Sequence, residues 1–283
     1  MGALRTCAAL AVAFLVMSGF SAAAETLSER GAYLVNGILA CANCHTPLGA
    51  NGPIVEKRLA GGRMFDTPAF KVFSSNITPD KDTGIGGWSD AQLKKFMTTG
   101  ERPSGVPVAP IMPTAYYKAL TPRDLDALVV YLRSVAPVRN EVGPADYKKP
   151  FGHEEAPFAD KRLTEADMGD PVKRGMYLVT LGHCLECHTP DAGGKHDYQN
   201  AAGKGGRVFP GPWGESRSSN ITSDKTSGIG GWSDDEIKRA VTQGIARDGR
   251  KLKPPMAFAA YAGLSATDQS AIVAFLRTLP ARE

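Results

Sequence analysis

The chain has 283 residues, of which 42% are hydrophobic and 22% charged, and its formal net charge is +4. Lysines and arginines are spread along the chain, so composition argues against a nucleic-acid-binding protein or a protein held on an anionic membrane surface. The length is sufficient for two domains of ordinary size.

The first 24 residues have the pattern of a secretory signal peptide. Arg5 gives a short positive region, residues 8–20 are almost wholly apolar, and three alanines precede Glu25. We therefore expect cleavage after Ala24 and export to a bacterial periplasm. No later stretch reaches the roughly 18 consecutive apolar residues of a membrane-spanning helix, so we expect no transmembrane anchor.

The rest of the chain repeats itself at an offset of 144 residues. Matching pairs include Gly31 and Gly175, Tyr33 and Tyr177, Asn76 and Asn220, Trp88 and Trp232, and Met112 and Met256. A long period that occurs twice indicates a duplicated domain. We place the first domain at residues 25–140, a linker rich in proline and glycine at 141–169, and the second domain at 170–283.

Each copy carries three helix-start signals in the same order. The starts are expected at Thr26 with Glu29 and Asp170 with Pro171, at Ser89 with Gln92 and Ser233 with Glu236, and at Thr121 and Ser265. Gly100 and Gly244 are suited to end the middle helices. The connecting segments show no sustained period-two alternation, so we expect an all-α fold of short helices and long loops. So little regular structure leaves the core to a bound cofactor.

Two copies of the string Cys-x-x-Cys-His, at residues 41–45 and 184–188, indicate what that cofactor is. This spacing is typical of c-type haem attachment, in which two thiols bond to the haem vinyl groups and the histidine binds the iron. The candidate attachment residues are Cys41, Cys44, Cys184 and Cys187, and the candidate iron ligands are His45 and His188. We therefore expect two covalently bound haem c groups, with each domain wrapped around one.

Two other interpretations of the cysteine pairs are weaker. A structural zinc site usually combines two pairs about 15 to 20 residues apart, whereas Cys44 and Cys184 lie 140 residues apart in different repeats. A thioredoxin-like disulfide motif belongs among alternating strands and helices, whereas a helix is expected before each string.

Met112 and Met256 are candidates for the second axial ligand of each iron, because they occupy equivalent positions in proline-rich loops. The alternative is that both fill gaps in apolar packing. His183 directly precedes Cys184, which places it at the attachment turn. His153 and His196 have no repeat equivalents, so we expect surface roles for them.

A second repeated block runs from Ser74 through Trp88 and from Ser218 through Trp232. Asn76 and Asn220 are candidates for hydrogen bonds to haem propionates, and Trp88 and Trp232 for packing on or near the ring. The alternative is ordinary turn chemistry with a core tryptophan.

Together, the two attachment strings, the Ser-Asn-Ile-Thr and Gly-Ile-Gly-Gly-Trp-Ser block and the methionine before the last helix resemble class I cytochrome c domains. More narrowly, they resemble the cytochrome c subunits of periplasmic alcohol, gluconate and related dehydrogenases. The resemblance implies proximal His45 and His188, distal Met112 and Met256, and thioether bonds at the four cysteines. Those subunits usually carry three haems, whereas this chain has two strings.

We therefore expect an electron-transfer protein and not an enzyme. It would take single electrons from a periplasmic dehydrogenase and pass them to a cytochrome or a terminal oxidase. The alternative is a dihaem enzyme, such as a peroxidase or a thiosulfate dehydrogenase. A peroxidase needs an open or displaceable iron position, and the two equivalent methionines argue against one. A thiosulfate dehydrogenase typically uses a cysteine ligand, and the mature chain has no cysteine outside the two attachment strings.

Overall fold

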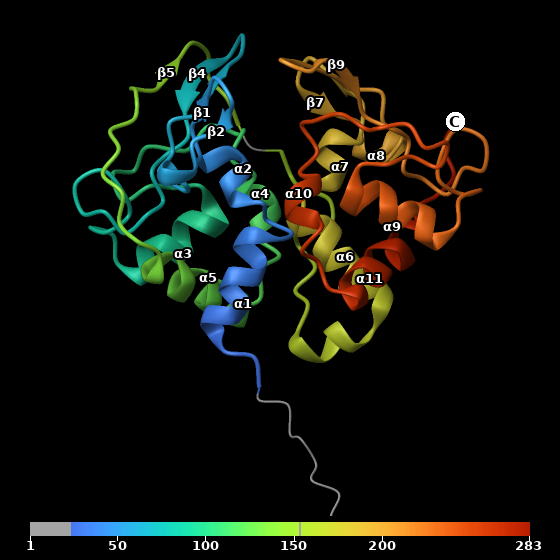
Figure 1. Cartoon of the computed structure of the whole chain (residues 1–283), viewed down its shortest axis with the longest axis horizontal. Coiled ribbons are helices and arrows are strands. Elements are labelled where there is room, and N and C mark those ends of the chain that lie inside the picture. The colour runs from blue at the N-terminus through green and yellow to red at the C-terminus, as the bar shows by residue number, and fades with distance from the viewer. Residues whose placement is uncertain (1–23, 153) are drawn as a thin grey trace, which may run out of the picture.

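A computed structural model describes residues 24–152 and 154–283. The predicted signal peptide, apart from Ala24, and His153 lie outside the described residues. The chain forms two halves that lie side by side, the first in blue to green and the second in yellow to red (Figure 1). No helix among the described residues is both long and apolar enough to cross a membrane.

The first half is built on two packed helices, α1 (Leu27–Asn36) and α5 (Pro122–Ser134). Its other helices are α2 (Cys41–His45), η1 (Val55–Lys57), α3 (Asp90–Thr99) and α4 (Thr114–Tyr117).

The second half repeats this plan with α6 (Pro171–Leu181) packed on α11 (Ala266–Leu276). Its other helices are η2 (Glu165–Gly169), α7 (Cys184–Cys187), α8 (Tyr198–Ala201), α9 (Asp234–Gln243) and α10 (Phe258–Tyr261).

The expected helix starts are confirmed. Complete capping boxes open α1, α3 and α9, at Thr26, Ser89 and Ser233. Asp170, Thr121 and Ser265 cap α6, α5 and α11 through their side-chain oxygens. Gly100 and Gly244 end α3 and α9 in the left-handed conformation that glycine adopts at low cost.

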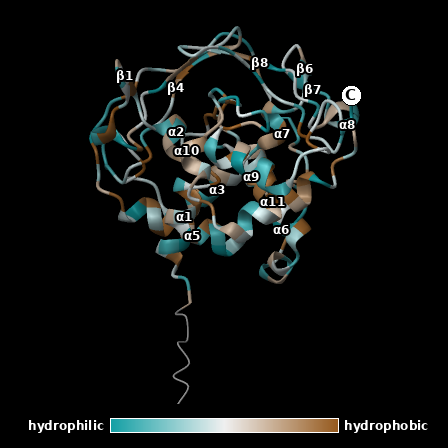
Figure 2. Cartoon of the chain, turned by 45° about the vertical axis from the view of Figure 1, so that its right-hand side comes forward, coloured by the Kyte–Doolittle hydropathy of each residue, from teal (hydrophilic) through white to brown (hydrophobic). Residues whose placement is uncertain are grey.

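The expectation of an all-α fold is wrong, because 36% of the structure is helix and 11% is strand. Four small antiparallel sheets occur among the described residues. Their strands are β1 (Leu48–Gly49), β2 (Gly52–Pro53), β3 (Met64–Asp66), β4 (Phe70–Phe73), β5 (Asp146–Tyr147), β6 (Asp191–Ala192), β7 (Lys195–His196), β8 (Val208–Gly211) and β9 (Gly214–Arg217). None exceeds four residues, so too few alternations exist to give a sequence signal. Figure 2 shows these strands along the rim opposite the crossed helices.

Glycine permits the close crossing of the two main helices in each half. A Cβ on Gly31 of α1 would lie 2.0 Å from the carbonyl oxygen of Ala127 in α5. A Cβ on Gly175 of α6 would lie 1.9 Å from the carbonyl oxygen of Ala271 in α11. Any side chain at these positions would force the helices apart, so the repeated glycine is a packing requirement of the fold.

The two halves share one hydrophobic core made by the chain itself. A single cluster includes Leu34 and Leu128 of the first half together with Leu178 and Val273 of the second. These four side chains are at most 2% exposed. The expectation that the cofactor alone supplies the core is therefore too strong, because the crossed helices bury a substantial apolar surface without it.

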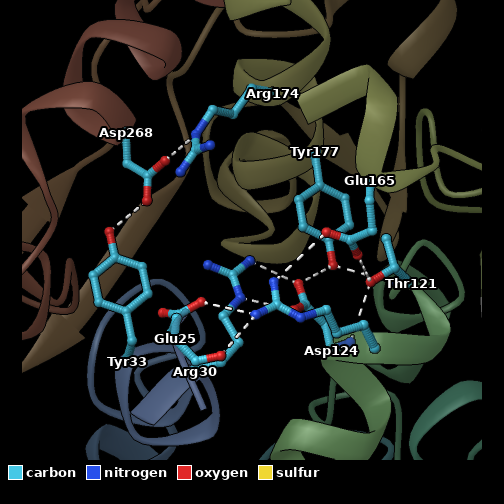
Figure 3. A network of polar contacts seen from close by, with 10 residues as sticks. Glu25, Arg30, Tyr33, Thr121, Asp124, Glu165, Arg174, Tyr177 and Asp268 are labelled. Carbon is cyan, nitrogen blue, oxygen red and sulfur yellow. Dashed lines mark hydrogen bonds and ion pairs between the residues drawn. The ribbon is translucent and has the colours of Figure 1, made fainter. Parts of the chain in front are cut away.

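Reciprocal polar contacts join the two halves (Figure 3). The hydroxyl of Tyr177 donates to Asp124 at 2.6 Å, and the hydroxyl of Tyr33 donates to Asp268. Each carboxylate also pairs with an arginine of its own half, Asp124 with Arg30 at 2.7 Å and Asp268 with Arg174. The partners correspond at the repeat offset. Such reciprocity is what a two-fold arrangement of equivalent surfaces produces.

Candidate functional site

The cysteines of both strings lie on single turns of helix, α2 and α7. In each turn the two cysteines are three residues apart, which places their thiols on one side of the turn. Burial raises the pKa of Cys41 and of Cys184 to about 12, and it also raises the pKa of Cys44. No disulfide joins any of the four motif cysteines in the part of the chain that the structure describes. They are therefore protonated at neutral pH and available for thioether bonds.

Each motif histidine is oriented by a backbone carbonyl. The Nδ1 of His45 lies 2.7 Å from the carbonyl oxygen of Ser75, and the Nδ1 of His188 lies 2.7 Å from that of Ser219. Because a carbonyl oxygen only accepts, Nδ1 carries the proton and the Nε2 lone pair is left for a metal. Burial lowers the pKa of both imidazoles, which keeps them neutral and able to bind metal.

Two glycines let those carbonyls come close to the attachment turns. Gly61 and Gly205 have φ values of +75° and +74°. A Cβ on Gly61 would lie 2.5 Å from the carbonyl carbon of Ser75, and one on Gly205 would lie 2.5 Å from that of Ser219. Sequence reasoning missed this role, although the Gly-Gly pair repeats at the offset of 144 and so provided a signal.

An arginine after each Gly-Gly pair supports the attachment turn. Arg207 donates to the carbonyl oxygen of Glu186 at 2.7 Å, and Arg63 donates to the equivalent carbonyl of Asn43. The guanidinium thus satisfies a carbonyl within the attachment string that a single helical turn leaves free. These residues were not anticipated from the sequence either.

Met112 and Met256 both lie in loops just before a short helix, α4 and α10, and both are half-buried against the hydrophobic core. A buried tyrosine of each short helix lies near the thiols of its own domain. Burial, followed by the nearby thiols, raises the pKa of Tyr117 and of Tyr261. The short helix that follows each methionine therefore packs near the attachment turn of its domain.

The amides of Asn76 and Asn220 bind the protein itself. Asn76 donates to Thr83 at 3.0 Å and to the carbonyl oxygen of Val138 at 2.7 Å, while its own oxygen accepts from Thr78. Asn220 repeats the arrangement, donating to the carbonyl oxygen of Arg282 at 2.6 Å. Both N–H groups of each amide are used, so these contacts give no support to a propionate role.

Trp88 and Trp232 are fixed at their backbone by an arginine at the end of the last helix of each half, Arg133 in the last turn of α5 and Arg277 directly after α11. Arg133 donates to the carbonyl oxygen of Trp88, and Arg277 to that of Trp232, each at 2.5 Å. The ring of Trp88 meets Phe96 edge-on, with centroids 5.3 Å apart. Each arginine therefore ties the tryptophan block to the crossed helices.

The remaining described histidines make contacts other than metal ligation. His183 begins α7 and lies beside Glu186, at the attachment turn as expected. The side chain of His196 is only 9% exposed, so a surface role is not what the structure shows. Its ring lies between Glu154 at 2.5 Å and Arg207 at 2.9 Å, so it anchors the linker to the second half.

The residues of each attachment turn fit haem c. Each turn combines two buried, protonated thiols with a neutral imidazole whose Nε2 is unprotonated, which is the donor set that covalent haem attachment requires. Within the described residues, no three His, Cys, Asp or Glu side chains gather into a group that could hold a metal ion. A zinc site built from both cysteine pairs therefore has no structural support.

Comparison with known proteins supports the same chemistry. The cytochrome c family model matches residues 28–136 and again residues 172–280. The chain is 35% identical to the fructose dehydrogenase cytochrome subunit of Gluconobacter japonicus, over 90% of this chain and 53% of that protein. It is 32% identical to the gluconate 2-dehydrogenase cytochrome c subunit of Pantoea cypripedii, over 78% of this chain and 52% of that protein.

A shorter relative is matched over most of its own length. The chain is 32% identical to a diheme cytochrome c-type protein of Cereibacter sphaeroides, over 86% of this chain and 83% of that protein. By contrast, the chain spans about half the length of the two dehydrogenase cytochrome subunits.

Proposed function

Since the chain belongs to the cytochrome c family and carries two covalently bound haem c groups, we propose that it takes single electrons from a dehydrogenase and passes them to a cytochrome or a terminal oxidase. The observation that supports this most directly is the pair of equivalent attachment turns with carbonyl-oriented histidines. Several relatives are the cytochrome subunits of dehydrogenases, and this similarity supports an electron-transfer role for this chain.

Haem c supplies a one-electron iron couple when it is bound. In the proposal, the four motif cysteines tether the two macrocycles, and His45 and His188 are the proximal ligands. Met112 and Met256 are the distal ligands, held by their proline-containing loops. With one histidine and one methionine each, the two irons would offer no free position to a substrate, which favours electron transfer over enzymatic turnover.

The packing of the halves supports electron passage from one domain to the other. A Cβ on Gly182, just before α7, would lie 3.0 Å from Ile38 of the first half. The hydroxyls of Tyr116 and Tyr198 also meet across the boundary at 2.5 Å. Burial raises the pKa of Cys187 to about 12, with a small contribution from Cys44 of the other turn. The two attachment turns therefore face one boundary.

The proposed working form is exported. Residues 1–24 would act as the signal peptide and be removed after Ala24, and the domains at 25–140 and 170–283 would each hold one haem in the periplasm. The segment 141–169 joins them, and its Glu165 lies 3.2 Å from Thr121 of the first domain. The electron donor and the electron acceptor would then bind a protein in which both haem sites are already formed.

The test uses Met112→Ala and Met256→Ala in the mature dihaem protein. Each variant should open one iron to carbon monoxide and should weaken the long-wavelength band of methionine-ligated ferric haem by about half, because one of two equivalent ligands is lost. The unmodified protein should bind no carbon monoxide. Binding to the unmodified protein would favour the alternative, a dihaem peroxidase, whereas unchanged binding in both variants would refute the methionine ligands.

A further inference from the structure

The loops that lead to the two methionines have the same backbone but different chemistry. Residues 103–109 and 247–253 correspond at the repeat offset. In each, an isolated β-bridge connects the loop to the residue two positions before it, Pro107 to Glu101 and Lys251 to Ile245, and the chain turns at a glycine with positive φ. The shared backbone makes the first domain an internal reference for the second.

The first loop, residues 103–109, contains no charged residue, whereas the second contains four cations and one anion. The cations are Arg247, Arg250, Lys251 and Lys253, and the anion is Asp248. We call residues 247–253 the basic loop. The net charge of the whole chain, +4, does not reveal this local concentration of cations.

The first loop is partly covered by the linker. Strand β5 extends the β3–β4 hairpin, and the hydroxyl of Tyr147 donates to the carbonyl oxygen of Pro107 at 3.3 Å. Ala109, which corresponds to Lys253, is 2% exposed and lies in a small apolar cluster with Phe70 and Val72. A cation could not occupy the position of Ala109 without being buried.

The basic loop is exposed in the structure. The side chains of Arg247 and Arg250 are 55% and 65% exposed, and both lysines are exposed. Arg247 and Arg250 also line a surface hollow together with Trp232. The loop ends three residues before Met256, so its charges lie on the segment that leads to the proposed ligand of the second haem.

We propose that the basic loop is the docking surface for an acidic redox protein, and that electrons are exchanged with that partner through the second domain. This inference rests on the proposed electron-transfer function. Exposed cations at this place attract a negatively charged surface over a Debye length of about 10 Å and orient it toward the second haem site. The loop of the first domain is also exposed at residues 103–107, but it carries no charge there, and its last two residues, 108 and 109, are buried.

A protein partner fits the arrangement better than an anionic membrane. Four cations on one short loop form a small patch, and Arg247 and Arg250 each have a carboxylate partner, Glu236 at 3.4 Å and Asp248 at 3.6 Å. This weak, partly paired charge suits a transient encounter. Its position beside Met256 serves electron exchange, which contact with lipid headgroups would obstruct.

The test compares the dihaem protein with Arg250→Glu/Lys251→Glu. Reduced protein is mixed with oxidised plastocyanin, a small acidic copper protein, and both the rate of oxidation and the affinity of the complex are measured. At an ionic strength of about 10 mM the variant should react about tenfold more slowly and bind more weakly, because steering charges are reversed. At about 0.5 M salt the rates should converge, since the charges are screened.

The matched control is Lys195→Glu/Lys204→Glu, which changes net charge equally at two exposed positions of the same domain. Equal losses in variant and control would overturn the docking surface, because only net charge would matter. Unchanged reaction with plastocyanin, but lost binding to phosphatidylglycerol vesicles, would assign the loop to a membrane and overturn the protein partner. A spectroelectrochemical titration tests the proposed function separately: if neither haem is reversibly reduced and oxidised by one electron in any of the proteins, electron transfer itself is refuted.

Discussion

The two domains agree where they hold the haem and differ where they face outward. Each has a helix crossing at a glycine, a histidine held by a serine carbonyl, and an arginine that ties the tryptophan block to the last helix. By contrast, the loop before the methionine is uncharged and has a buried end in the first domain, whereas in the second it is basic and its last residue, Lys253, is exposed. The difference indicates that duplication kept the attachment geometry and left the surface free to serve different contacts.

The contacts across the boundary between the domains are also the same in both copies of the repeat. Tyr33 and Tyr177 reach across it to Asp268 and Asp124, which are 1% and 2% exposed. A buried carboxylate is expensive unless it is paired, and each is paired with an arginine of its own domain and a tyrosine of the other. The arrangement therefore favours one fixed relation between the haem sites.

Removing the thiols of one domain should have the largest effect. We expect Cys184→Ser/Cys187→Ser and Cys41→Ser/Cys44→Ser each to lose one of the two covalent haems, because the tether needs the sulfurs. The measurement is the ratio of acid-resistant haem to protein. Loss of both haems in either double variant would show that the two attachment sites do not mature independently. It would contradict the view that the domains are equivalent, separate haem-binding units.

A side chain at either helix crossing should be severely destabilising. Gly31→Ala and Gly175→Ala each place a Cβ about 2 Å from a carbonyl oxygen, so we expect a loss of roughly 3 kcal/mol in the free energy of unfolding. Denaturant unfolding measures it. Gly152→Ala is the control, since nothing lies within 4 Å of its added Cβ. A near-neutral result at only one crossing would show that the domains pack differently.

Loss of one tyrosine hydroxyl at the boundary should lower the unfolding free energy by less than a side chain at the helix crossing, and by different amounts in the two domains. Tyr177 is 2% exposed whereas Tyr33 is half-buried, so Tyr177→Phe should cost about 2 kcal/mol and Tyr33→Phe about 1 kcal/mol in unfolding free energy. Tyr131→Phe is the control, because among the described residues its hydroxyl is bound by Asn36 of the same domain. Equal costs for all three would argue against a bond specific to the boundary.

The smallest expected effect is on stability at high pH. Burial, followed by the charge of Asp124, raises the pKa of Tyr177 well above its ordinary value of 10.0. Because the unfolded tyrosine ionises first, the stability from this group is complete below pH 10 and is lost as pH rises above it. The wild-type protein should therefore lose more stability between pH 9 and pH 11 than Tyr177→Phe. Parallel losses, measured by denaturant unfolding, would contradict the assignment.

Much of the local structure could be predicted from the sequence. Caps such as Ser89 and Ser233 act within one turn of helix, so their effect is visible in a few consecutive letters. The small sheets were missed because β4 offers only four residues of alternation and gains its second neighbour, β5, from 75 residues away. The amides of Asn76 and Asn220 were candidates for haem propionate contacts, with turn chemistry as the alternative, and they donate to carbonyl oxygens in the segments after α5 and α11.

The amino-acid sequence by itself determined how many haems the chain holds and which atoms tether them, because attachment depends on residue types within five consecutive positions. Only the tertiary structure decided which carbonyl orients each imidazole, which tyrosine crosses to which carboxylate, and that the linker binds the methionine loop of the first domain through Tyr147. Those relations join residues dozens of positions apart, where packing and burial select the partner.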